Sequence, residues 1–151
     1  MSEHIIKRHN KTLLLYHLVF PVKYRRKVFS DKVEKTLKTI CLEIEIGYEI
    51  NFVEIGADED HVHFLVQSVP SLSITRIVTI IKSITAIGIF QEYPEIKKKK
   101  LWGGNLWTSG YYANTVGKHN NEKAIQEYVQ NQGKKYAKIY QGQLKIFEGL
   151  A

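Results

Sequence analysis

Segments with helical periodicity alternate with segments of strand character, and their order constrains the fold more than any other feature of the sequence. Runs of branched and aromatic residues predict strands over residues 12–20, 50–57, 61–66 and 106–116. Apolar residues at helical spacing predict helices over residues 31–47 and 72–90. The order β-α-β-β-α-β is that of the α+β ferredoxin-like (RRM-like) split βαβ fold, in which helices cover one face of a four-stranded antiparallel sheet.

Local signals refine these elements. Asp31 followed by Glu34 is a capping-box pattern, so we expect it to begin the first helix. Residues 72–90 are rich in Ile and Thr, which favour strands, but their length and helical stripe favour a helix. An irregularity is expected at Gly110 in the last strand. A further C-terminal helix, capped by Asn120 or Asn121, is predicted to run to Gly133.

The composition bounds the classes of function. A length of 151 residues fits a single domain over 1–151, and we expect neither a membrane span nor a signal peptide. The one cysteine, Cys41, excludes an intramolecular disulfide and a zinc site with several thiolates, which fits a cytoplasmic protein. The 22 Lys and Arg outnumber the 15 Asp and Glu, giving a net charge of +7. This excess favours a polyanionic partner, either a nucleic acid or an acidic membrane surface.

Two histidines lie two residues apart on the predicted strand 61–66. Side chains alternate along a strand, so His61 and His63 share one face while Val62 and Phe64 point to the other. Their Cα atoms are then about 6.6 to 7 Å apart, close enough for both rings to bind one metal ion. The alternative is a pair of exposed or hydrogen-bonded strand histidines without a metal.

The predicted C-terminal helix carries a tyrosine and a glutamine one turn apart. Tyr128 and Gln132 lie on the same helical stripe as Ile125 and Val129. Taken alone, Tyr128 can be a core aromatic and Gln132 a residue at the edge of the core. A buried glutamine needs a polar partner, however, and a metal ion that binds its carbonyl oxygen would supply one.

Five sequence motifs together resemble one enzyme family. They are Tyr16–Phe20, Lys23–Val28, Asp60–Val66, Trp107–Tyr112 and Tyr128–Gln132. In this order and spacing the chain resembles the HUH single-tyrosine transposases of the smallest prokaryotic insertion sequences, over about residues 10–148. The chain departs from the family at Glu59, where a proline is common, and in its Ile- and Thr-rich second helix.

The resemblance implies a role for each candidate site residue. His61, His63 and Gln132 would bind Mg²⁺ or Mn²⁺, and Tyr128 would be the nucleophile. The family cleaves single-stranded DNA at hairpin-marked element ends and leaves a 5′-phosphotyrosine and a free 3′-hydroxyl. It acts as a homodimer in which the tyrosine helix of one subunit can complete the histidine site of the other. No nucleotide cofactor is expected, in agreement with the absence of a phosphate-binding glycine loop.

Basic residues are the candidates for binding the DNA strand. The predicted loop after the first strand combines cations with one aromatic ring, and one further lysine lies on the second helix: Lys23, Tyr24, Arg25, Arg26, Lys27 and Lys82. The run 97–100 of four lysines is interpreted as solvated surface, with nonspecific attraction to DNA as the alternative. Two alternatives remain at this point: a non-catalytic module that binds single-stranded DNA or RNA, and a related HUH nickase or repeat-processing protein.

Overall fold

The computed structural model describes residues 4–116, in which strands and helices follow the predicted order. The main elements are β3 (Leu14–Pro21), α1 (Asp31–Gly47), β4 (Asn51–Asp58), β5 (His61–Ser68), α2 (Ile74–Glu92) and β6 (Tyr112–Thr115). The strands form one four-stranded sheet in the order β4-β5-β3-β6, and all neighbouring strands are antiparallel. This is the predicted ferredoxin-like arrangement, with the first strand of the motif, β3, at the centre of the sheet.

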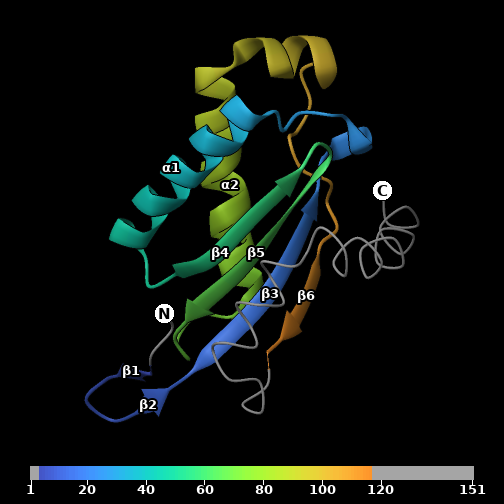
Figure 1. The fold of residues 1–151 in the computed structure, drawn as a ribbon. Coiled ribbons are helices and arrows are strands. Elements are labelled where there is room, and N and C mark those ends of the chain that lie inside the picture. Colours follow the sequence, from blue (N-terminus) through green and yellow to red (C-terminus); the bar gives the residue numbers. More distant parts are fainter. Residues whose placement is uncertain (1–3, 117–151) are drawn as a thin grey trace.

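Both helices lie on the same face of the sheet (Figure 1) and enclose the main core. Leu18 and Phe20 of β3 and Phe64 of β5 are fully buried there, and the rings of Phe20 and Phe64 have centroids 5.1 Å apart. Leu37 of α1 and Ile81 of α2 belong to the same cluster. Full burial of one such side chain contributes about 1.5 to 3 kcal/mol. The helices therefore determine which face of the sheet belongs to the main core. The opposite face is left available for a functional site.

The first residue of α1 is Asp31, but its cap is Ser30. Ser30 has extended backbone angles (φ −71°, ψ 169°), and its Oγ accepts a hydrogen bond from the Val33 amide at 3.4 Å. The expectation that Asp31 starts a capping box is therefore wrong by one residue, because Asp31 is already helical. Asp31 and Glu34 instead lie in the first turn, where negative charge is favoured by the helix dipole.

The helix α2 forms despite its β-branched composition because its apolar stripe is buried. Ser73 caps it by accepting from the Arg76 amide at 3.1 Å. The buried Thr85 hydroxyl donates to the Ile81 carbonyl at 2.6 Å and accepts from Trp107 Nε1 at 3.1 Å, so it has partners on both sides. Tertiary packing thus outweighs the weak helix propensity of the segment.

Among residues 4–116, α2 is the one helix long and apolar enough to cross a membrane, with a mean hydropathy of 1.4. A helix in the core of a globular domain has the same properties. The buried stripe of α2 belongs to the main core, and the helix packs against α1 where a Cβ at Gly88 would lie 2.6 Å from Ile40 Cδ1. The missing side chain at Gly88 therefore lets α1 and α2 approach closely.

The last strand is shorter than the predicted 106–116. Trp107 forms an isolated bridge with Val22, and regular pairing with β3 resumes only at Tyr112. The expected irregularity at Gly110 lies in the gap between them. The hairpin of β1 (Ile5–Ile6) and β2 (Lys11–Thr12) was not expected, and it extends beyond the start of β3 (Figure 1). The predicted helix ending at Gly133 lies outside the described residues.

Candidate active site

The two histidines of β5 lie on the sheet face opposite the helices, as the alternation predicts. Val62, Phe64 and Val66 enter the main core with the helices, whereas Leu65 packs with Leu15 in a separate cluster. His61 and His63 share the side of Leu65 and are 6% and 3% exposed. Of the alternative without a metal, exposed histidines do not fit the structure, whereas hydrogen-bonded histidines do, since His61 contacts Asp60.

His61 lies between two carboxylates at the start of β5. Its Nδ1 is 2.8 Å from Asp60 Oδ1, and its Nε2 is 3.0 Å from Asp58 Oδ2. A carboxylate on one nitrogen of an imidazole fixes the orientation of the ring and increases its basicity as a ligand. Sequence reasoning did not assign roles to Asp58 and Asp60, although an aspartate directly before a histidine was the available signal for Asp60.

Asp60 is itself held by a guanidinium. Arg25 Nη2 donates to Asp60 Oδ2 at 2.9 Å, and both side chains are about two-thirds buried or more. The hydrogen bond with His61 and the charge of Arg25 lower the pKa of the Asp60 carboxyl against the opposing effect of its burial. Asp60 is therefore ionised at neutral pH and links the basic segment to His61.

His63 faces a third histidine, which lies on β3. The ring centroids of His17 and His63 are 6.4 Å apart, and Tyr112 of β6 lies 6.5 Å from His17 on the other side. Burial lowers the pKa of His63 to about 3, and the charges of His17 and His61 add to this effect. Burial also lowers the pKa of His17 to about 4, against a hydrogen bond with Asn114. Both rings are therefore neutral at pH 7.

Sequence reasoning assigned His17 no role in the site. Its position follows from the strand register, in which Val19 faces His63 on one side of β3 and Tyr112 on the other. His17 lies two residues before Val19 and therefore on the same face of the sheet. This register could not be read from either strand alone.

The imidazole nitrogens of His61 and His63 can bind a divalent metal ion if another residue supplies a third ligand. Neutral imidazole is the form that binds metals, and the burial of His63 favours this form. Residues 4–116 contain no group of three or more His, Cys, Asp or Glu side chains arranged to hold a metal. A site built on His61 and His63 thus needs a ligand from elsewhere in the chain or from a partner. The other predicted site residues, Tyr128 and Gln132, lie outside the described part.

The basic segment, residues 23–27, is an ordered turn beside the histidines and not the simple loop expected. It begins with the short 3₁₀ helix η1 (Lys23–Arg25). The Lys23 amide donates to the Leu106 carbonyl at 2.8 Å, and the amides of Val28 and Phe29 donate to the Glu59 carbonyl at 2.8 and 3.0 Å. The segment is therefore tied to the turn between β4 and β5.

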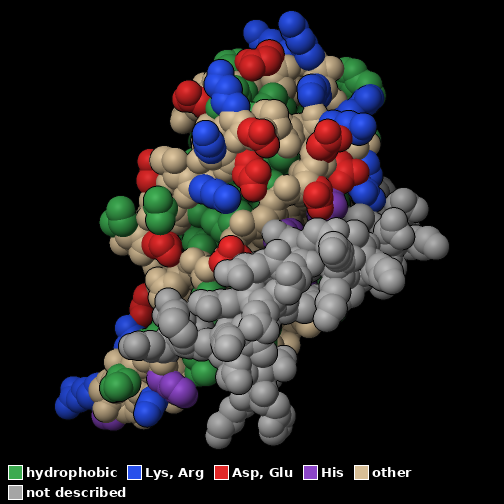
Figure 2. All heavy atoms as spheres, in the orientation of Figure 1, with side chains coloured by type: hydrophobic (Ala, Val, Ile, Leu, Met, Phe, Trp, Pro, Cys, Tyr) green, Lys and Arg blue, Asp and Glu red, His purple; other side chains and the backbone are tan. Residues whose placement is uncertain are grey.

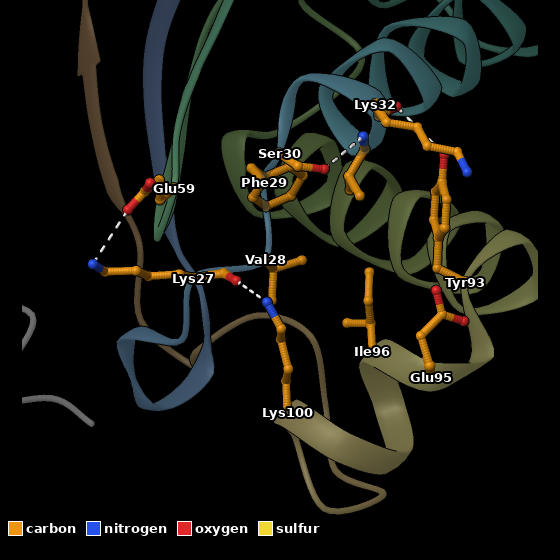
Figure 3. A pocket seen from close by; sticks show the side chains of 11 residues that line it. Lys27, Val28, Phe29, Ser30, Lys32, Glu59, Tyr93, Glu95, Ile96 and Lys100 are labelled. Atoms are coloured by element: carbon orange, nitrogen blue, oxygen red, sulfur yellow. Dashed lines mark hydrogen bonds and ion pairs between the residues drawn. The ribbon is translucent and has the colours of Figure 1, made fainter.

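A second contact holds the basic segment from the other side. Figure 3 shows a pocket between this segment, the start of α1 and the helical turn η2 (Ile96–Lys100). The volume of the pocket is about 460 Å³. Lys100 Nζ donates to the Lys27 carbonyl, and Lys27 Nζ lies 3.4 Å from Glu59 Oε2. The lysine run interpreted as solvated surface thus includes one lysine, Lys100, that supports the fold.

Lys82 of α2 forms hydrogen bonds with the segment that precedes β6. Its Nζ donates to the carbonyls of Thr108, Ser109 and Gly110 at 2.8, 3.4 and 3.2 Å. The ammonium also lies 5.4 Å from the Tyr111 ring centroid, and burial lowers the pKa of Lys82 to about 8. The structure thus gives Lys82 a role in the fold, while its contact with DNA stays a prediction.

The surface charge is mixed. Figure 2 shows Lys and Arg side chains gathered toward the end of the molecule that carries η1 and η2, with Asp and Glu side chains between them. Some of these acids are neutralised by ion pairs, as Glu59 is by Lys27 and Asp60 by Arg25. The acids of the β4–β5 turn near His61 are therefore balanced in part by cations of the basic segment.

Comparisons with known proteins agree in sequence and fold. The sequence model described as "Transposase IS200 like" matches residues 10–132. The ISDra2 transposase TnpA of Deinococcus radiodurans is 37% identical over 119 residues, which cover 79% of this chain and 84% of that protein. The transposase for insertion sequence element IS200 of Salmonella typhimurium is 27% identical over 124 residues, covering 82% and 80%.

Solved structures give the same picture. The crystal structure of a putative transposase from Deinococcus radiodurans matches with a TM-score of 0.69 and 34% identity, over 85% of this chain and 97% of that one. A REP-associated tyrosine transposase bound to a REP hairpin matches with a TM-score of 0.51 and 11% identity, over 85% and 68%. The second likeness concerns the fold alone.

Proposed function

The chain belongs to the IS200-like transposase family, and we propose that it cleaves and rejoins single-stranded DNA at hairpin-marked ends of an insertion sequence through Tyr128. The observation that carries the proposal is the buried pair His61 and His63 on one face of β5, next to a basic segment. A module that only binds nucleic acid has no need for two buried histidines on one face of a strand, one of them held by a carboxylate. The family membership adds the expectation of DNA strand transfer.

His61, His63 and Gln132 would hold the divalent ion, Mg²⁺ or Mn²⁺. When bound, such an ion would withdraw charge from the scissile phosphate and leave room for a phosphate oxygen. The protein's own contribution is to orient His61 through Asp60 and to keep His63 unprotonated by burial. Arg25 positions Asp60 and so acts on His61 indirectly.

Tyr128 would supply the nucleophilic oxygen. A phenol has a pKa of about 10, so it must lose its proton as it attacks phosphorus. The bond from Tyr128 Oη to phosphorus forms while the bond from phosphorus to the 3′ oxygen breaks, and the leaving oxygen takes a proton to become the 3′-hydroxyl. The phosphotyrosine conserves the phosphodiester, and attack by another 3′-hydroxyl rejoins the strand without a nucleotide cofactor.

The proposed partners are a DNA strand and a second copy of the chain. The basic segment, with Lys23, Tyr24, Arg26 and Lys27 on its surface, would bind single-stranded DNA that bears a hairpin. Its ties to the β4–β5 turn support this assignment, because they place it beside His61. A homodimer that shares its sites would bring Tyr128 of one subunit to the histidines of the other, and we propose a cytoplasmic setting for the reaction.

The test is the covalent adduct. Incubation with hairpin-bearing single-stranded DNA and Mg²⁺ or Mn²⁺ is expected to give a protein–DNA species that survives denaturing electrophoresis, and Tyr128→Phe should abolish it. Tyr136→Phe, a change of the same chemistry elsewhere in the chain, is the matched control and should leave the adduct intact. An undiminished adduct with Tyr128→Phe would overturn the nucleophile. DNA binding without cleavage in the wild-type protein would favour the binding module.

A further inference from the structure

Two exposed aromatic rings from distant parts of the sequence meet beside the basic segment. Tyr24 of η1 is 57% exposed, and Trp102, just after η2, is 65% exposed. Their ring centroids are 5.4 Å apart and the planes are inclined by 51°. Figure 1 shows the chain after η2 passing alongside η1. Large aromatic side chains are normally buried to a greater extent, so this pair leaves an unusual apolar surface open to solvent.

Each of the two rings has a cationic side chain next to it. The Arg26 guanidinium lies 4.4 Å from the Trp102 ring centroid, and Lys23 Nζ lies 5.6 Å from that of Tyr24. The acids of the adjoining β4–β5 turn are already paired, Glu59 with Lys27 and Asp60 with Arg25. The surface therefore combines π faces with positive charge, which suits a base attached to a phosphodiester backbone.

The backbone that presents these rings adopts a conformation that non-glycine residues rarely occupy. Within residues 4–116, the non-glycine residues with positive φ are Tyr24 (59°), Arg25 (54°) and Trp102 (50°). This conformation is unfavourable for bulky residues and persists where the surrounding structure enforces it, often at functional sites. Here the Gly103 amide donates to the Lys97 carbonyl at 2.7 Å, which fixes the turn that carries Trp102.

We propose that Tyr24 and Trp102 form a stacking platform for an unpaired base of single-stranded DNA. The proposal rests on the proposed function and deepens it, because it assigns Trp102 and identifies how the strand is held near the site. Bases in a duplex are stacked on each other and cannot offer a face to the platform. Tyr24 adjoins Arg25, which contacts the Asp60 that orients His61. A base on the platform would thus belong to the strand that reaches the histidines.

The test compares two probes of equal length and charge, an oligothymidylate and an abasic deoxyribose-phosphate strand, on the full chain. Trp102→Ala is expected to weaken binding of oligothymidylate about tenfold, as loss of one base–aromatic stack does, and to leave binding of the abasic strand unchanged. Trp102→Phe should retain most of the affinity because a phenyl ring also stacks. Tyr48→Ala, which removes an exposed tyrosine at the end of α1, is the matched control and should change neither.

Tryptophan fluorescence of the wild-type protein gives a second readout that needs no variant. Trp102 is exposed while Trp107 is 5% exposed, so acrylamide quenching reports mainly on Trp102. Oligothymidylate should protect this signal and the abasic strand should not. Equal protection by both strands, or Trp102→Ala binding oligothymidylate as tightly as Tyr48→Ala, would overturn the platform. If the wild-type protein still forms the Tyr128 adduct, only the platform fails; absence of both DNA binding and adduct overturns the proposed function as well.

Discussion

Arg25 Nη2 lies 2.9 Å from Asp60 Oδ2 in a partly buried ion pair that joins the basic segment to the start of β5. The second oxygen of the same carboxylate lies 2.8 Å from His61 Nδ1. Three residues therefore form a continuous chain from a surface that carries cations and aromatic rings to a candidate metal ligand. A carboxylate held at both oxygens restricts the rotation of the imidazole it contacts.

Asp60→Asn should weaken metal binding. The amide cannot accept from both His61 and Arg25 as the carboxylate does, so we expect Mn²⁺ affinity to fall about tenfold, within the range seen for partners of metal-bound histidines. Titration of free Mn²⁺ by electron paramagnetic resonance measures this directly. Glu59→Gln, the same change on the neighbouring exposed carboxylate, should have no effect. Equal affinities for the two variants would show that Asp60 does not support His61.

The unfolding free energy of the metal-free protein should decrease as the pH is lowered below about 6.5. Unfolded His17 gains a proton near that pH, while the folded ring stays neutral down to its pKa of about 4. The unfolded state therefore binds more protons between these values, and each such histidine lowers the unfolding free energy by up to about 1.4 kcal/mol per pH unit. His63, with a pKa of about 3, acts in the same direction over a wider range.

The variant His17→Gln isolates one part of this dependence. Urea unfolding is measured with a chelator present at several pH values between 7 and 4. The slope of the unfolding free energy against pH should be smaller in this variant than in the wild-type protein, because one histidine no longer takes up a proton on unfolding. His9→Gln, which changes an exposed histidine between β1 and β2, should retain the full slope. A His17→Gln slope equal to that of the wild-type protein would contradict the low pKa of His17.

Lys82→Met should destabilise the fold. The variant removes a cation that donates to three carbonyls before β6, while it also removes the cost of burying that cation. We therefore expect a net loss of about 1 to 2 kcal/mol in urea unfolding. Lys98→Met, on an exposed lysine of η2, should change stability little. A Lys82→Met protein as stable as Lys98→Met would show that these bonds contribute nothing.

The same pair of variants tests the prediction that Lys82 binds DNA. A lysine that contacts a phosphate contributes about one to the slope of log affinity against log salt. Lys82→Met should reduce that slope if Lys82 reaches the strand. An unchanged slope together with reduced stability would assign Lys82 to the fold alone.

Mixed dimers test whether sites are shared between subunits. Neither His63→Ala nor Tyr128→Phe should form an adduct alone, but a heterodimer of the two has one site with all its groups if the tyrosine helix acts on the partner's histidines. Some cleavage should therefore return on mixing, measured with differently tagged subunits so that the heterodimer is verified. A verified heterodimer without cleavage would indicate that each subunit uses its own Tyr128.

The fold and the histidine pair could be predicted from the sequence because both depend on local periodicity. The alternation around His61 and His63 is a property of one strand, and burial of Val62 and Phe64 fixes its orientation. The role of His17 could not be predicted, since it depends on the register between β3 and β5. Trp102 was missed for a similar reason, because a left-handed residue held by tertiary contacts leaves no periodic signal.

The central position of β3 has a consequence for how the chain is made. This strand is the first long one to be synthesised, yet its two neighbours in the sheet, β5 and β6, begin only at His61 and Tyr112. One edge of this apolar strand therefore lacks its partner until β5 has emerged, and the other edge lacks its partner until most of the chain has been made and β6 emerges. Unpaired apolar edges are where nascent chains associate with one another. Yield in the cell should thus depend on translation speed and on chaperones more than the small size of the protein suggests.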